Sequence, residues 1–176
     1  ADALGIRGDQ LFVGGESAGG GLTAALCLYA RDRHEVNIAY QMPLYPMLDY
    51  RSSTLSMKDN NAPIWGQAQN IVAWNIYLNG DTSKVSKYAS PSMETDYSNL
   101  PPTTTFIGSV DAFRDETIVY VENLKKAGVP VKFMLCQGGF HSSESLVPKA
   151  KVSIEARKFF MDAFDYACEH YFAAQE

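Results

Sequence analysis

A serine flanked by glycines is the first feature of the sequence that could do chemistry. Gly15-Glu16-Ser17-Ala18-Gly19 fits the pattern G-x-S-x-G, and it lies between the apolar run 11–13 and the small-residue segment 18–30. A sharp turn between a buried strand and a helix is the setting of a nucleophile elbow, where a serine hydroxyl stands clear of a sheet. The pattern therefore predicts Ser17 as a nucleophile. The alternative is that Ser17 merely caps the helix.

The residues around Ser17 suit this interpretation. Gly15 and Gly19 lack side chains that would collide where strand and helix pass close together. The N-terminus of the following helix would favour negative charge on a developing oxyanion. We expect the backbone N–H of Ala18 to donate one hydrogen bond to that oxyanion.

A general base can be sought among only three histidines. His34 lies in a charged segment, and His170 lies near the end of the last predicted helix. His141 lies in a glycine-containing loop just after the predicted strand 131–136, and such loops hold the chemistry of open α/β sheets. The sequence therefore predicts His141 as the base.

The carboxylate that should orient this base is predicted at Asp111, which follows the predicted strand 103–108. Asp115 is the alternative, although acidic residues in a first helical turn are expected from the helix dipole alone. The chain order Ser17, Asp111, His141 is that of α/β-hydrolases and differs from the orders in chymotrypsin and subtilisin.

Strand-like and helix-like segments alternate along the chain. Strands are expected at 11–13, 36–45, 103–108 and 131–136, and helices at 18–30, 62–78, 115–127 and 152–172. Within the helices, helical spacing relates Leu22, Leu26 and Tyr29, and the last helix should bury Phe159, Phe160, Ala163, Phe164 and Ala167. This alternation predicts an α/β protein with a mostly parallel sheet flanked by helices.

Several motifs make the sequence similar to the hormone-sensitive-lipase-like family of α/β-hydrolases, the acetyl-esterase and carboxylesterase group. The stretch 8–20 resembles the family's G-D-S-A-G-G elbow. Segments 44–49, 90–91 and 100–102 resemble its next strand and its S-P and L-P-P motifs, and 110–116 resembles D-P-L-R-D-E. The resemblance implies an α/β-hydrolase fold, with Asp111 as the acid and His141, from the family's H-G-F segment, as the base.

The sequence also departs from the family pattern. Ser142-Ser143 replaces G-F after the histidine, and Ala112 replaces proline. The family's H-G-G-G loop, which supplies further oxyanion donors, does not occur before Ser17. We therefore expect residues 1–176 to form the C-terminal portion of a single α/β-hydrolase domain that lacks its N-terminal strands. An N-terminal half or a second chain is the expected partner that completes the fold.

The predicted activity is hydrolysis of carboxylic esters, particularly short-chain acyl esters, through an acyl-enzyme and without metal or organic cofactor. Candidates for the substrate pocket are Glu16, Tyr45, Trp65 and Phe140. A peptidase or amidase on the same fold and a non-catalytic interaction module remain the alternatives.

The composition of the chain argues against some classes of partner. With a net charge of -5 and no basic block, neither nucleic acid nor an anionic membrane surface is indicated. No apolar run is long enough to span a bilayer. Three widely spaced cysteines are expected to be buried free thiols, which suits a cytoplasmic location.

Overall fold

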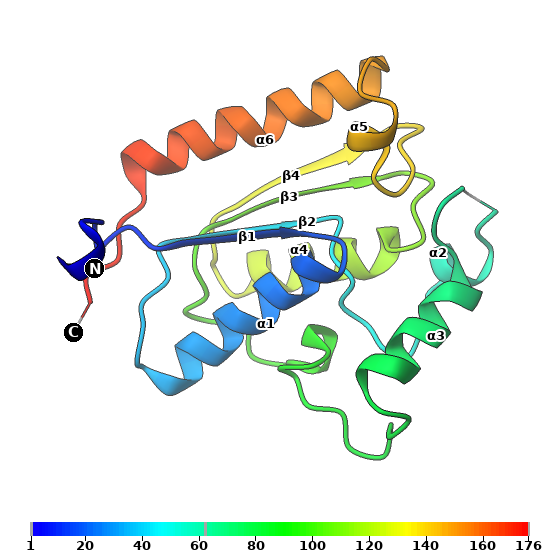
Figure 1. The fold of residues 1–176 in the computed structure, drawn as a ribbon, viewed down its shortest axis with the longest axis horizontal. Coiled ribbons are helices and arrows are strands. Elements are labelled where there is room, and N and C mark those ends of the chain that lie inside the picture. Colours follow the sequence, from blue (N-terminus) through cyan, green and yellow to red (C-terminus); the bar gives the residue numbers. More distant parts are fainter. Residues whose placement is uncertain (1, 62, 176) are drawn as a thin grey trace.

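The computed structural model describes residues 2–61 and 63–175 and shows a four-stranded parallel sheet (Figure 1). Its strands lie side by side in chain order: β1 (Phe12–Glu16), β2 (Tyr40–Leu44), β3 (Thr103–Gly108) and β4 (Val131–Cys136). β1 pairs along its length with β2, and β3 with β4, whereas β2 and β3 share a single register position, Gln41 opposite Thr103. The predicted α/β class with a parallel sheet is confirmed.

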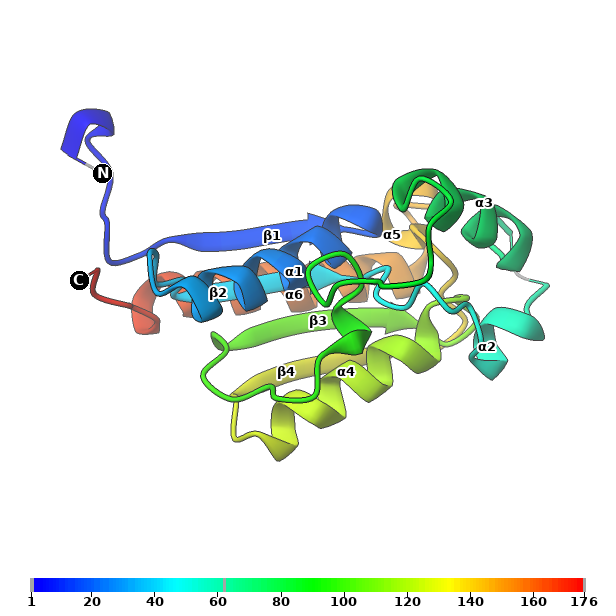
Figure 2. The same ribbon diagram turned by 90° about the horizontal axis from the view of Figure 1, so that it is seen from below.

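Helices cover both faces of this sheet. α1 (Ala18–Arg33) and α4 (Arg114–Lys126) lie on one face, and α6 (Lys151–His170) lies on the other (Figures 1 and 2). The shorter helices α2 (Leu55–Lys58), α3 (Gln67–Tyr77) and α5 (Ser143–Leu146) gather near the carboxyl ends of the strands. Two 3-10 turns, Asp2–Leu4 and Pro91–Met93, complete the elements. None of the helices in the described part of the chain is long and apolar enough to cross a bilayer.

Some predicted bounds are wrong. The strand expected at 36–45 is limited to β2, because the chain at 36–39 approaches the sheet and joins the ladder only at Tyr40. The helix expected at 62–78 begins at Gln67, after Gly66 in an extended conformation; residue 62 lies outside the described residues. α2 and α5 escaped prediction because single helical turns are too short to show a 3.6-residue period.

The core forms two clusters. One contains Ala156 of α6 together with Tyr45, Trp74, Phe106, Ile107 and Phe113. The other contains residues of α1 and α4 and their neighbours: Ala24, Cys27, Leu28, Leu48, Tyr120 and Leu124. Small residues thus bring α1 close to the sheet, as the sequence of that helix suggested.

The larger apolar residues of α1 lie elsewhere. Leu22, Leu26 and Tyr29 are 55%, 48% and 43% exposed, although their helical spacing is that of a buried stripe. Phe164 of α6 is also exposed, which corrects its predicted burial, and Cys168 is exposed whereas Cys27 and Cys136 are buried. Phe164 packs against Phe12 of β1, and Leu26 and Tyr29 line a hollow with Leu11 and Val13. β1 is the outermost strand of the sheet in Figure 2, and within the described residues no further strand pairs with it.

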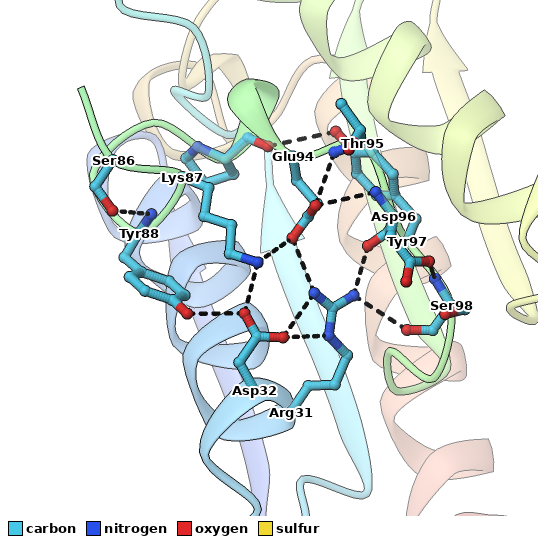
Figure 3. Close-up of polar contacts among 11 residues, drawn as sticks. Arg31, Asp32, Ser86, Lys87, Tyr88, Glu94, Thr95, Asp96, Tyr97 and Ser98 are labelled. Atoms are coloured by element: carbon cyan, nitrogen blue, oxygen red, sulfur yellow. Dashed lines mark hydrogen bonds and ion pairs between the residues drawn. The ribbon is translucent and has the colours of Figure 1, made fainter. Parts of the chain in front are cut away.

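A network of ion pairs fixes the segment 86–98 to the C-terminal end of α1 (Figure 3). Arg31 pairs with Asp32 and Glu94 at 2.8 Å, and Lys87 pairs with Asp32 at 2.6 Å and Glu94 at 2.8 Å. The Tyr88 hydroxyl donates to Asp32 at 2.8 Å. Although desolvation opposes ionisation, these donors lower the pKa of Asp32 to about 2. The network holds the chain that leads into β3.

Candidate active site

Ser17 lies at the turn between β1 and α1 with a positive φ of 55° and ψ of -117°. Such angles are costly for a residue with a side chain and persist only when neighbouring contacts fix them. Here the Ser17 N–H donates to the Leu44 carbonyl at 3.0 Å, and the Ser17 carbonyl accepts from Gly21 and Met47 at 3.1 and 2.9 Å. The turn therefore has the geometry of the predicted nucleophile elbow.

Close backbone approach explains three glycines at this turn. A Cβ on Gly15 would lie 2.4 Å from the Gly19 carbonyl oxygen, so the expectation for Gly15 is confirmed. The expectation for Gly19 is wrong, because a Cβ there would meet nothing within 4 Å. The crowded helical positions are Gly20 and Gly21, where a Cβ would lie 2.9 Å from the Leu44 carbonyl oxygen and 2.1 Å from the Met47 carbonyl oxygen, respectively. Sequence spacing missed Gly21, the more crowded of the two, because Met47 belongs to a segment beyond β2.

Three side chains from separate strand ends form one hydrogen-bonded row. The Ser17 Oγ lies 2.8 Å from His141 Nε2, and His141 Nδ1 lies 3.0 Å from Asp111 Oδ2. Asp111 Oδ1 accepts from the Phe113 N–H at 2.9 Å, which fixes the carboxylate. Asp111 and His141 are both buried. The structure thus brings together the three residues that the sequence selected.

The competing residues have other partners. Asp115 accepts the Ser56 N–H at 2.8 Å and pairs with Arg114, so it anchors α2 rather than facing His141. His34 is an exposed C-cap of α1, and His170 is exposed with its Nδ1 2.8 Å from the Tyr166 carbonyl. Ser17 occupies the N-cap position of α1, but its side chain makes no capping hydrogen bond and lies against His141 instead, which disfavours the alternative that its hydroxyl merely caps the helix.

Ala18 is the first residue of α1 and is exposed. An amide at this position has no acceptor within its own helix, and the helix dipole adds positive potential there. This placement suits the predicted oxyanion donor beside the Ser17 hydroxyl.

The pocket candidates lie at different depths. Glu16 is exposed, whereas Trp65 and Phe140 are partly buried. The Trp65 ring lies 6.1 Å from the His141 ring, and Tyr45 is buried with its ring 5.2 Å from it. Their roles toward substrate stay predictions. An apolar cavity of about 180 Å³ lies beside the elbow and is lined by Ala18, Gly21, Leu22, Met47, Ala73, Trp74, Tyr77 and Ala89.

Two buried glutamates near the site were not found from the sequence. Glu116 Oε1 accepts the Leu48 and Asp49 N–H groups at 2.7 and 3.3 Å, and burial raises its pKa well above the ordinary value. This role could not be predicted from the sequence, because an acidic residue in the first turn of a helix is expected from the helix dipole alone. The other is Glu144, which accepts a hydrogen bond from Tyr45. Within residues 2–61 and 63–175, no cluster of His, Cys, Asp and Glu could hold a metal ion.

A parallel sheet flanked by helices, with a serine presented at a strained strand-to-helix turn, defines the class of α/β proteins built around a nucleophile elbow. The comparison with known families agrees: the model described as the alpha/beta hydrolase fold matches residues 1–145. The chain belongs to this family, and its predicted resemblance to the esterase group of α/β-hydrolases is confirmed.

Individual relatives place the chain among esterases. An arylesterase of Saccharolobus solfataricus is 30% identical over 81% of this chain and 47% of the relative. The solved structure titled bacterial heroin esterase superposes with a TM-score of 0.82 at 40% identity, over 88% of this chain and 50% of the other. Esterase LipW from Mycobacterium marinum gives a TM-score of 0.84 at 30% identity, over 94% and 52%. The chain spans about half the length of these relatives.

Proposed function

We propose that this chain carries the catalytic residues of a serine hydrolase that cleaves carboxylic esters. The observation that carries the proposal is the hydrogen-bonded row from Ser17 through His141 to Asp111, with distances of 2.8 and 3.0 Å. The esterase names of its relatives support the substrate class.

The mechanism follows from these atoms. Ser17 Oγ attacks the ester carbonyl carbon while its proton passes to His141 Nε2. Asp111 Oδ2 accepts the Nδ1–H bond, which fixes the tautomer and stabilises the imidazolium. The Ala18 N–H donates to the oxyanion of the tetrahedral intermediate. His141 then protonates the departing alkoxide, and a water molecule activated by His141 releases the acyl group as a carboxylic acid.

Hydrolysis of p-nitrophenyl acetate and covalent labelling by a fluorophosphonate test the proposal. Ser17→Ala should abolish labelling and reduce hydrolysis by ~10⁴-fold or more. Ser53→Ala changes an exposed serine away from the row and should leave both unchanged. Equal hydrolysis by the wild-type protein and the Ser17→Ala variant would refute the assignment.

The apolar cavity beside the elbow supports a preference for short acyl groups. Its volume of about 180 Å³ is below the range of ~300–1,000 Å³ found for pockets that hold drug-sized ligands. Ala73→Leu would narrow the cavity and should reduce hydrolysis of the butyrate ester relative to the acetate ester. Val72→Leu, on the exposed side of the same helix, is the control. A wild-type preference for octanoate would contradict the proposal.

We also infer that a further polypeptide, supplying additional strands and oxyanion donors, pairs with the edge of β1. Among the described residues β1 pairs with β2 alone, and an unpaired strand edge invites strand addition. Exposed apolar residues lie at this edge: Phe164 of α6 packs against Phe12, and Leu26 of α1 lines a hollow with Leu11 and Val13. Native mass spectrometry and assays on the purified chain test this inference. A lone 19.4 kDa monomer with turnover in the usual range of ~1–10³ s⁻¹ would contradict it.

A further inference from the structure

Tyr45 lies directly against the proposed base and has no part in the mechanism above. Its ring contacts the His141 ring edge to face, with centroids 5.2 Å apart at 81°. The residue is only 1% exposed and has a positive φ of 34°, held by a hydrogen bond from its N–H to the Phe106 carbonyl. A strained backbone that aims a buried ring at a titratable group suggests a role for that ring.

The hydroxyl of Tyr45 reaches a buried carboxylate. It donates to Glu144 Oε1 at 2.7 Å, and Glu144 is 4% exposed on α5, three residues after His141 in the chain. Burial raises the pKa of the Tyr45 phenol, and Glu144 and Glu16 raise it further, so the phenol stays protonated and acts as the donor. Arg157 donates to the Glu144 carbonyl at 2.7 Å, which ties this turn to α6.

This pair is not explained by packing alone. Burying a carboxylate is costly unless its hydrogen bonds compensate, and well-packed apolar residues often stabilise a fold equally well. Glu144 Oε1 also accepts from Ser145 at 3.0 Å, whereas Oε2 is buried and has no hydrogen-bond partner among the described residues. A buried carboxylate with half of its acceptors unused therefore points to a role other than stability.

Two other aromatic rings surround the imidazole. Phe113 lies 5.1 Å from it, and Trp65 lies 6.1 Å from it with its indole N–H bonded to Asn70 at 3.1 Å. Of these three rings, Tyr45 has a polar group tied to the same turn that carries His141. This hydrogen bond therefore links Tyr45, just after β2, to the loop that carries His141.

We propose that Glu144 and Tyr45 are positioning residues: their hydrogen bond fixes the Tyr45 ring against His141 and keeps the imidazole aligned between Ser17 and Asp111. This inference rests on the proposed function, since it assigns these residues to the alignment of its base. The proposed role depends on the position of the hydrogen-bond acceptor and not on its charge. An amide oxygen at position 144 should therefore serve nearly as well as a carboxylate oxygen.

Four variants separate positioning from general stability. Tyr45→Phe keeps the ring and removes the donor, Glu144→Ala removes the acceptor, and Glu144→Gln keeps an acceptor. Tyr120→Phe is the matched control, because it removes another buried hydroxyl, bonded to Gln41 at 3.2 Å in the opposite core cluster. Two readouts are used: the rate of Ser17 labelling by a fluorophosphonate, and the low-field proton NMR resonance of the His141 Nδ1–H.

We expect Tyr45→Phe and Glu144→Ala to slow labelling by about tenfold or more, because displacing a reacting group by ~1 Å can cost 10²-fold. Their Nδ1–H resonance should shift or broaden. The labelling rate of Glu144→Gln should stay within about threefold of the wild-type rate, and Tyr120→Phe should change neither readout. Thermal unfolding of each variant ensures that spectra are compared on folded protein.

The outcomes also separate this inference from the proposed function. A wild-type protein that stays unlabelled even when the polypeptide that completes the fold is bound refutes the proposed function, and the NMR resonance then decides the positioning role alone. Labelling and resonance unchanged in Tyr45→Phe overturn the positioning role, and so does a Glu144→Gln variant as slow as Tyr45→Phe. If Glu144→Ala does not fold, Tyr45→Phe and Glu144→Gln still decide the question.

Discussion

The two ends of α1 show two ways of using polar groups. At its N-terminal end, Ser17 is strained and bonded through its side chain to His141, and Gly21 touches the backbone of Met47. At its C-terminal end, Arg31 and Asp32 each have several partners in a partly buried ion-pair network. Each side chain of the N-terminal end thus depends on a single contact, whereas each charged group of the C-terminal end has several partners.

This difference predicts how each end responds to change. A row of single hydrogen bonds cannot compensate for a lost member, so the site end should lose activity sharply. A network with several donors for each carboxylate can re-form around a substitution, and the exposed pair of Arg33 with Glu35 at the same end contributes little in any case. If the contrast holds, substitutions at the two ends of α1 should differ clearly in the size of their effects.

Replacing the proposed acid should have the largest effect. Asp111→Asn keeps the shape but favours the wrong tautomer of His141, and ester hydrolysis should fall by about 10³–10⁴-fold. Asp115→Asn, four positions along the chain, is the control, because Asp115 binds the Ser56 N–H rather than His141. Its activity should stay within a few fold of wild type. Similar losses in both variants would undo the assignment of Asp111.

Crowding the N-terminal end of α1 should come next. The Cβ in Gly21→Ala would lie 2.1 Å from the Met47 carbonyl oxygen, and forcing the two segments apart should cost roughly 3 kcal/mol of unfolding free energy. Gly19→Ala places a Cβ in open space on the same helix and should be neutral or stabilise by up to about 1 kcal/mol. Urea unfolding measures both. A Gly21→Ala variant as stable as Gly19→Ala would contradict the prediction, because it would show that the segment around Met47 can move to accommodate the added Cβ.

A charge removed from the network should have a smaller, pH-dependent effect. Although desolvation opposes ionisation, hydrogen bonds from Lys87, Asp96, Thr95 and Arg31 hold the pKa of Glu94 below its ordinary value of 4.5. Glu94→Gln should therefore cost about 1–2 kcal/mol at pH 7.

The sign of this pH dependence follows from the lowered pKa. Glu94 contributes its stability above pH 4.5, where it is ionised in both states, and loses it as the pH falls through the lower folded value. The difference in unfolding free energy between wild type and variant should thus shrink as the pH falls from about 5 to about 2. A difference that stays constant down to pH 2 would show that Glu94 acts through packing.

The smallest change is expected for an exposed ion pair at the same end. Arg33 pairs with Glu35 at 2.8 Å, and both side chains are more than half exposed, at 54% and 61%. Arg33→Ala should shift the melting temperature by about 2 °C or less. Glu94→Gln, measured in parallel by calorimetry, is the reference; a larger shift for Arg33→Ala would reverse the expected order within the network end.

The order of strands and helices along the chain, the strained turn at Ser17 and the selection of His141 and Asp111 could be predicted from the sequence, because turn-forming residues and hydrophobic periodicity are properties of neighbouring residues. The buried face of α1, the exposure of Phe164, the need for glycine at 21 rather than at 19, and the contact of Tyr45 with Glu144 are evident only in the folded chain. Each of those depends on a segment distant in the chain, such as Met47 against α1. Periodicity shows that a helix has an apolar side, but the partner that covers that side is fixed only when the chain packs.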